Sequence, residues 1–166
     1  LAFHSGLGKG TMCVVRLPLT LAILDGLLLH VGAQSMVIPV IAVTEFLRPT
    51  RAQVQSLAGQ RVLMLRGQAL PIVRLADVYG IADAVDDPCA GLVLVIDSDG
   101  RRFGLLVDGL TGQSQVVLKS LEANYRRIDG ILGATILGDG AIALIIDVAG
   151  LTRTASSRRA PTPVAA

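Results

Sequence analysis

A chain of 166 residues suits one domain or two small lobes, and it is long enough to bury a core without disulfides or metals to reinforce it. Hydrophobic residues make up 52% of the chain but aromatic residues only 3%, so valine, leucine and isoleucine must build that core, which favours strands. A formal net charge of +2, with few aromatic side chains and no basic stripe, argues against a nucleic-acid-binding protein.

The N-terminal segment carries a glycine-rich loop, Gly8-Lys9-Gly10-Thr11, within the run SGLGKGTMCVVRL. Phosphate-binding P-loops have the order G-x-x-x-x-G-K-[ST] and lead from a strand into a helix. Here the order is G-L-G-K-G-T, and the residues that follow, MCVVRLPL, are typical of a strand. By itself the motif therefore predicts a plain turn in preference to a nucleotide site.

The uncharged stretch 26–44, GLLLHVGAQSMVIPVIAVT, approaches the length of a membrane-spanning helix. The polar turn GAQS interrupts it midway, and Pro39 lies in its second half. We therefore expect a β-hairpin here and no membrane insertion. Because no signal peptide precedes this stretch, the sequence predicts a cytoplasmic protein.

Four pairs of apolar runs are separated by short glycine-containing turns, and each pair predicts a β-hairpin. The turns are GAQ at 32–34, RGQ at 66–68, SDG at 98–100 and GDG at 138–140. Short helices are expected at 50–59 (TRAQVQSLAG), 75–80 (LADVYG) and 120–127 (SLEANYRR). The sequence thus predicts an all-β protein with short helices only.

The two halves of the chain resemble each other weakly. LRGQALPIV at 65–73 aligns with LGDGAIALI at 137–145, and MVIPV at 36–40 resembles FGLLV at 103–107. Two similar lobes, each a small β-barrel, would produce this pattern, and chance similarity is an equally good explanation.

Composition marks a boundary and a tail. The segment 80–90, GIADAVDDPCA, is acidic and contains Pro88, as expected between two lobes. The last residues, 154–166, are poor in apolar side chains, so we expect a disordered tail.

Residues able to carry catalysis or bind a metal are few and scattered. His4 and His30 have no Cys, Asp or Glu at metal-ligand spacing and form no arrangement with a nucleophile. Cys13 and Cys89 lack CxxC spacing and are interpreted as buried, reduced thiols, with a disulfide the less favoured alternative. The sequence therefore predicts no catalytic residue, no metal and no cofactor.

Two charged residues stand out from their apolar surroundings. Glu45 lies in the segment VTEFL, and Arg66 opens the RGQ turn. A carboxylate among apolar side chains is costly to desolvate unless it is paired, and the planar fork of an arginine is its best partner. Two solvated surface charges are the alternative, which these residues alone favour slightly.

Several motifs together resemble one known family. The run GLGKGTMCVVRLPLTLAILDGLLLHVG is similar to the junction in chemotaxis histidine kinases of the CheA type, where the ATP-binding domain passes into the C-terminal regulatory domain. That regulatory domain is itself similar to the adaptor CheW. Its successive blocks resemble IPVIAVTEFLRP, VLMLRGQALPIVRLADVYG, GLLVDGLTGQSQVVLKSL and GILGATILGDGAIALIIDVAGL. The resemblance extends from Gly6 to Leu151, and LPLTLAI and GATILGDG are specific to the kinases.

This resemblance implies a fold of two intertwined, five-stranded SH3-like barrels. Residues 1–20 would be the C-terminal remnant of the ATP-binding domain, and 21–153 the CheW-like regulatory domain. Gly8, Lys9, Gly10 and Thr11 match the last glycine box of the kinase ATP site, so they would form a vestigial ATP-lid loop. The rest of that site should lie upstream. The chain would then have no enzyme activity of its own, whereas its parent would be an ATP-dependent histidine kinase.

The resemblance also implies partners. Such domains bind the adaptor CheW end-on and the tips of methyl-accepting chemoreceptors, and they adjoin the kinase's own ATP-binding domain in cytoplasmic arrays beneath the membrane. Val43 and Glu45 match the V-x-E of CheW-like domains, and Arg66 and Gly67 match their L-R-G. The implied role of these four residues is receptor and adaptor coupling, supported by a Glu45–Arg66 pair, so the resemblance favours pairing of these two residues over two solvated charges. Two alternatives are an ATP-binding fragment acting through the glycine loop and a standalone barrel for a small apolar ligand.

Overall fold

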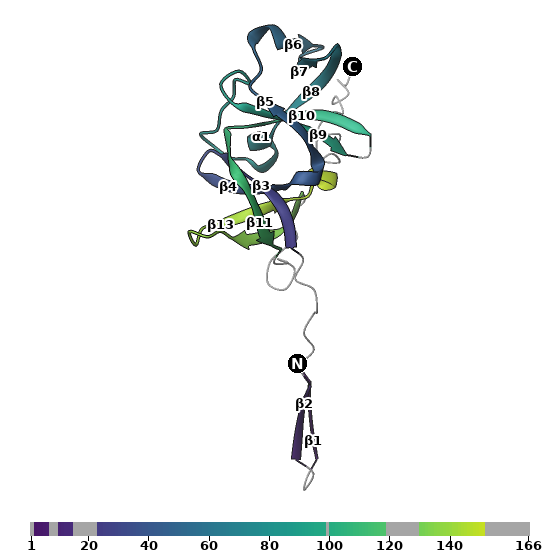
Figure 1. The fold of residues 1–166 in the computed structure, drawn as a ribbon, viewed down its shortest axis with the longest axis vertical. Helices are drawn as coiled ribbons and strands as arrows, with labels where there is room; N and C mark the ends of the chain where they lie inside the picture. Colours follow the sequence, from purple (N-terminus) through teal and green to yellow (C-terminus); the bar gives the residue numbers. More distant parts are fainter. Residues whose placement is uncertain (1, 7–9, 15–22, 99, 119–129, 152–166) are drawn as a thin grey trace, which may run out of the picture.

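The computed structural model describes residues 2–6, 10–14, 23–98, 100–118 and 130–151, and it arranges them mainly as β-strands (Figure 1). The strands are β1 (Ala2–Gly6), β2 (Gly10–Val14), β3 (Ile23–Val31), β4 (Gln34–Pro39), β5 (Val43–Leu47), β6 (Val54–Leu57), β7 (Gln60–Leu65), β8 (Gln68–Arg74), β9 (Leu92–Ser98), β10 (Arg101–Val107), β11 (Gly109–Val117), β12 (Ile131–Ile136) and β13 (Ile142–Ile146). The short helices include α1 (Leu75–Tyr79) and the 3-10 helices η1 (Val40–Ala42) and η2 (Arg51–Gln53). The expectation of an all-β protein is confirmed.

Two large sheets carry the fold, and the chain enters the first of them twice. The first sheet has the strand order β11-β3-β4-β13-β12, and the second sheet has the order β5-β9-β10-β8-β7-β6. After β4 the chain crosses through η1 into the second sheet, and it returns at Asp108, between β10 and β11. The sheets are therefore intertwined, consistent with two SH3-like barrels. The second sheet has six strands in place of the expected five, because β6 pairs with β7.

The two sheets repeat one arrangement. Each has a parallel pair of strands at its centre, β4 with β13 in the first sheet and β10 with β8 in the second. The similar segments of the sequence fall on matching strands: 65–73 overlaps β8 and 137–145 overlaps β13, while 36–40 and 103–107 lie on β4 and β10. The weak internal similarity thus coincides with a structural repeat.

All four predicted hairpins form, as β3–β4, β7–β8, β9–β10 and β12–β13. In β7–β8, Leu65 pairs with Gln68 across the two-residue turn Arg66-Gly67. Both turn residues have a positive φ, 49° for Arg66 and 79° for Gly67, as in a type I′ turn. The uncharged stretch 26–44 folds mainly as the β3–β4 hairpin. Within the described ranges, no helix is long and apolar enough to cross a membrane.

The helix expected at 50–59 is wrong. Thr50 and Gln53 do form a reciprocal capping box, with the Thr50 N–H donating to Gln53 Oε1 at 2.9 Å, but only the single turn η2 follows. The next residues form β6, which pairs with β7. Ala58 and Gly59 both take a positive φ, so the chain reverses into β7 where a helix would have continued.

Other expectations concern the middle and the end of the chain. The helix expected at 75–80 is α1, which ends at Gly80 in the left-handed conformation. The acidic segment 80–90 joins α1 to β9. Because β8 and β9 both belong to the second sheet, the chain does not change sheets there. The helix expected at 120–127 and the tail 154–166 lie outside the described residues.

Among the residues that the structure describes, three apolar clusters stabilise the fold. A central cluster takes side chains from both sheets, whereas two smaller clusters belong to one sheet each. Successive residues of β9 divide between them: Leu94 lies in the central cluster, and Val93 and Val95 lie in the second sheet's own cluster. Val37 and Ile145 belong to the first sheet's own cluster. Full burial of such a side chain contributes about 1.5–3 kcal/mol, so the shared cluster joins the two sheets firmly.

Candidate functional site

Glu45 and Arg66 form an ion pair across the second sheet. Glu45 lies on the edge strand β5, and Arg66 lies in the turn between β7 and β8. An Arg66 guanidinium N–H donates to Glu45 Oε2 at 2.9 Å. The predicted pairing of these two residues is confirmed, and it connects strands that are not neighbours in the sheet order.

The local backbone explains how Glu45 reaches this position. Val43 pairs with Ile96 and Glu45 with Val95, so β5 has a register shift between Val43 and Glu45. Such a bulge re-aims the side chains that follow it. Thr44 is held at the bulge because its hydroxyl donates to the backbone oxygen of Val95 at 3.1 Å. Val43 packs against the central cluster.

A second arginine, which sequence reasoning missed, approaches the same carboxylate. Arg102 of β10 places a guanidinium nitrogen 4.0 Å from Glu45 Oε1, and another of its nitrogens donates to Gln68 Oε1 at 3.0 Å. Glu45 therefore has a guanidinium on each of its two oxygens. The alternation of β10 could have pointed to Arg102, because buried Phe103 faces the core and its neighbour must face the other side.

The pair is only partly shielded from water. The Glu45 side chain is 27% exposed, whereas the Arg66 side chain is 77% exposed. An ion pair with one partner so open to solvent contributes at most about 1 kcal/mol to stability. The arrangement therefore serves to place charges at the surface more than to hold the fold together.

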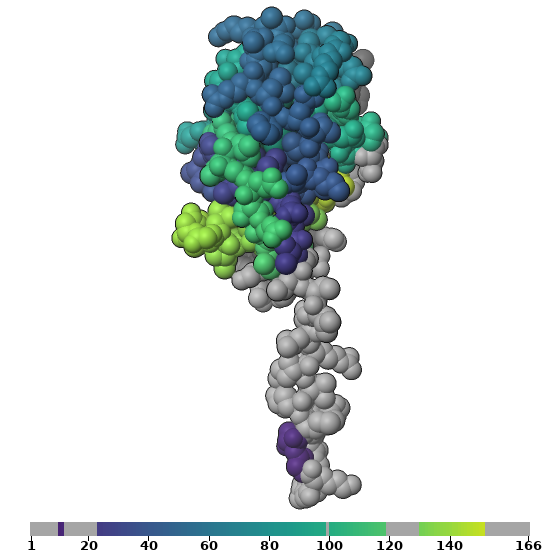
Figure 2. All heavy atoms as spheres, in the orientation of Figure 1, coloured from purple at the N-terminus to yellow at the C-terminus, as the bar shows by residue number. Residues whose placement is uncertain are grey.

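Exposed apolar side chains lie close to this pair in the sequence. Ile41 in η1 is 94% exposed and Phe46 on β5 is 53% exposed. Atoms of the 40–60 region form much of the surface seen in the upper part of Figure 2. A second set of exposed apolar residues, Leu132, Ile136 and Ile142, lies on the β12–β13 hairpin of the first sheet. Clustered apolar side chains on a surface are typical of protein interfaces.

The glycine loop belongs to a separate two-stranded sheet. β1 and β2 pair with each other, with Ser5 opposite Thr11 and Gly6 opposite Gly10. Gly10 has a φ of 80°, and both Gly10 and Thr11 are exposed. Gly8 and Lys9 lie outside the described residues. The loop leads into a strand, as predicted from MCVV, so it lacks the helix N-terminus that holds phosphate in a P-loop.

Among the other candidate residues, the structure describes the side chains of His30 and Cys89. His30 is exposed on β3, opposite Gly109 of β11. Cys89 is a free, half-buried thiol, and the effect of its surroundings, desolvation first and the Asp87 carboxylate second, is to raise its pKa. In the ranges that the structure describes, no three His, Cys, Asp or Glu residues lie close enough together to hold a metal ion.

The fold agrees with what comparison with known proteins shows. Residues 25–156 match the family model of the CheW-like domain, so the chain belongs to the CheW-like domain family. It shares its fold with the scaffolding protein TtCheW from Thermoanaerobacter tengcongensis, with a TM-score of 0.58 at 14% identity, over 75% of this chain and 88% of that one.

The sequence relatives are longer proteins. The chain is 49% identical over 149 residues, 89% of its length, to the chemotaxis protein CheA of Klebsiella aerogenes. It is 49% identical over 145 residues to CheA of Salmonella typhimurium, and 37% identical over 153 residues to the sensor histidine kinase CheAY of Helicobacter pylori. It spans 23%, 22% and 19% of these three relatives, less than a quarter of each.

Proposed function

We propose that this chain is the regulatory domain of a chemotaxis histidine kinase, which binds the adaptor CheW and the tips of chemoreceptors and places the kinase under receptor control. The observation that carries the proposal is the 49% identity to CheA proteins across nearly the whole chain, which includes the CheW-like domain. The domain itself is a binding module without catalytic residues, and the kinase activity belongs to the parent protein. The domain is located in the cytoplasm, where its partners attach it to an array of membrane chemoreceptors.

Val43, Glu45, Arg66 and Gly67 are the proposed coupling residues. The bulge at β5 and the type I′ turn fix the backbone on both sides of the ion pair, so the two charges are presented in a defined geometry. Exposed Phe46 adjoins Glu45 in the sequence and offers apolar area to a partner. The adaptor CheW would bind at one end of a barrel, and the exposed apolar residues of the β12–β13 hairpin are the best candidates for that contact surface.

Gly8 to Thr11 are proposed as the last piece of an ATP lid, within a segment (1–20) that belongs to the kinase's ATP-binding domain. The paired strands β1 and β2 support this, because a hairpin can end one domain and lead into the next. A lid alone supplies no base pocket and no metal ligands. This chain should therefore show no saturable ATP binding at millimolar nucleotide.

An NMR titration of the labelled chain with CheW from the same cell tests the adaptor role. Saturable shifts at residues of the β12–β13 hairpin, reduced by Ile142→Ser, are expected. A parallel titration with a receptor-tip fragment should shift residues 43–47 and 66–68. Glu45→Gln and Arg66→Ala should weaken that binding, whereas Arg51→Ala, at a 91% exposed arginine 3.9 Å from Asp87, should not. Absence of saturable binding to either partner would overturn the proposal.

A further inference from the structure

The segment between β8 and β9 contacts both sheets. This segment, the connector, comprises α1 and the residues up to Gly91, that is 75–91. Leu75 and Ala76 are buried in the central cluster, and Ile81 and Ala84 pack against it. The connector therefore lies against the apolar layer that the two sheets share, and its polar groups decide how it is held there.

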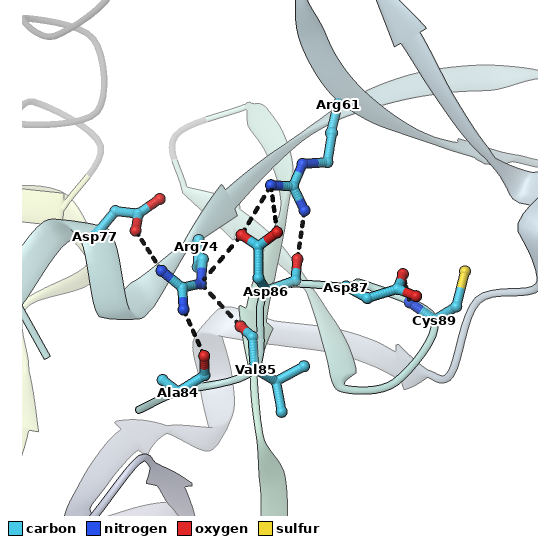
Figure 3. Close-up of polar contacts among 8 residues, drawn as sticks. All are labelled: Arg61, Arg74, Asp77, Ala84, Val85, Asp86, Asp87 and Cys89. Carbon is cyan, nitrogen blue, oxygen red and sulfur yellow. Dashed lines mark hydrogen bonds and ion pairs between the residues drawn. The ribbon is translucent and has the colours of Figure 1, made fainter. Parts of the chain in front are cut away.

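Two arginines of the second sheet hold one side of the connector (Figure 3). Arg74, at the end of β8, donates to the backbone oxygens of Ala84 at 2.5 Å and Val85 at 2.8 Å. Arg61, on β7, donates to the backbone oxygen of Asp86 and to both of its carboxylate oxygens, at 2.8 and 3.1 Å. Three successive carbonyl groups are thus fixed to the second sheet.

One carboxylate holds the other side. Asp108 lies where the chain returns from the second sheet to the first. Its Oδ1 accepts the N–H of Val85 at 3.0 Å, and its Oδ2 accepts the N–H of Gly32 at 2.9 Å. Gly32 belongs to the β3–β4 turn of the first sheet. The turn and the connector are in close contact, since a Cβ on Gly32 would lie 2.6 Å from the backbone oxygen of Ala82.

We propose that the connector is a latch between the two sheets, with Asp108 as the residue that closes it. Opening the latch breaks hydrogen bonds of the connector but leaves the central cluster and the two separate clusters in place, so both sheets stay folded when it opens. The central cluster holds the sheets together by apolar contacts, which are non-directional and do not by themselves fix one angle between the sheets. The Asp108 carboxylate, by contrast, accepts the N–H of Gly32 in the first sheet and the N–H of Val85 in the connector, so it fixes their relative position. Opening it leaves the Tyr79 hydroxyl of the connector bonded to the Gly130 oxygen at 2.6 Å, and it loosens the angle between the sheets about that remaining contact.

Amide hydrogen exchange and residual dipolar couplings of the 166-residue chain test this latch. In Asp108→Asn the side chain keeps one acceptor oxygen in place of two, so Gly32 or Val85 should exchange about tenfold faster. The couplings should report a changed or more mobile angle between the sheets. Leu63 and Ile145, in the two separate clusters, should keep their protection. The matched control is Asp139→Asn, because Asp139 accepts only the local N–H of Ala141 among its described contacts.

A second variant keeps the test decisive if Asp108→Asn does not fold. Arg74→Lys retains the positive charge but cannot reach two carbonyl groups with one planar fork. It should speed exchange at Val85 and loosen the angle between the sheets, and leave Gly32 protected. Unchanged couplings in both variants would overturn the latch. Equal acceleration at Leu63 and Ile145 would also overturn it, because Asp108 would then be a residue of general stability.

Discussion

The hydroxyl of Tyr79 links helix α1 to the residue that precedes β12 of the first sheet. The hydroxyl of Tyr79 in α1 donates to the backbone oxygen of Gly130, next to β12, at 2.6 Å. Burial raises the pKa of Tyr79 well above its usual value of 10.0, and the nearby Asp147 carboxylate raises it further. The native state therefore holds this proton more tightly than the unfolded chain does, so the hydroxyl's contribution to stability is complete below pH 10 and declines as the pH rises beyond that value.

Tyr79→Phe should change the response to alkali. At neutral pH the loss of one hydrogen bond should cost about 1 kcal/mol, since the Gly130 oxygen keeps the N–H of Asp147 at 2.8 Å. Between pH 9 and pH 11 the free energy of unfolding should fall less steeply in the variant than in the wild type. Urea unfolding followed by circular dichroism at several pH values measures both slopes. Equal slopes in the two proteins would show that folding does not change the pKa of Tyr79.

Asp86 is shifted in the opposite direction. The hydrogen bond from Arg61, together with the charge of that guanidinium, lowers the pKa of Asp86 below its usual 3.8. The contribution of this pair is present above pH 3.8 and is lost as the pH falls through the lowered pKa. A carbon-detected NMR titration should place the Asp86 midpoint below 3.8, and Arg61→Gln should raise that midpoint. If Arg61→Gln leaves the Asp86 midpoint unchanged, Arg61 and Asp86 are not paired in solution.

At the scale of elements, the turn between β7 and β8 depends on Gly67. Its φ is 79°, and a Cβ built there would meet nothing within 4 Å, so a substitution would cost backbone strain without a steric clash. Gly67→Ala should lower the free energy of unfolding by about 1–2 kcal/mol. Gly138→Ala is the control, because a Cβ there is equally free of contacts and its φ lies outside the left-handed range. Thermal melting of both variants makes the comparison, and equal melting temperatures would refute this account of the turn.

The same turns explain which elements were predictable. Glycine beside a polar residue marks a reversal locally, so the four hairpins could be predicted from the sequence alone. The strand β6 was missed because Ala52, Gln53 and Leu57 have good helix propensity, and pairing with β7 overrides that propensity. The sequence and the family resemblance together indicated Glu45 with Arg66. Arg102 was missed because its approach to Glu45 depends on how β5 and β10 pair with β9 between them, which is a tertiary feature.

At the scale of the whole molecule, the interleaved topology makes the two sheets depend on each other. The first sheet is complete only after the chain has passed through the second, and the central cluster takes side chains from both. The separate clusters are smaller and could not easily stabilise either sheet alone. We therefore expect the two sheets to unfold in one cooperative transition, even though the latch lets their relative angle vary.

Leu94→Ala tests that cooperativity. Leu94 is fully buried in the central cluster, so the truncation should cost about 2–5 kcal/mol. Amide signals from β7 and from β13, which report on different sheets, should melt together at a lower temperature than in the wild type. Val93→Ala is the neighbouring control: Val93 is equally buried but lies in the second sheet's own cluster, and it loses less volume. If the sheets are coupled through the central cluster, this variant too should melt in a single transition. Separate melting of β7 and β13 in either variant would mean that each sheet is stable by itself, and that the central cluster only holds two independent units together.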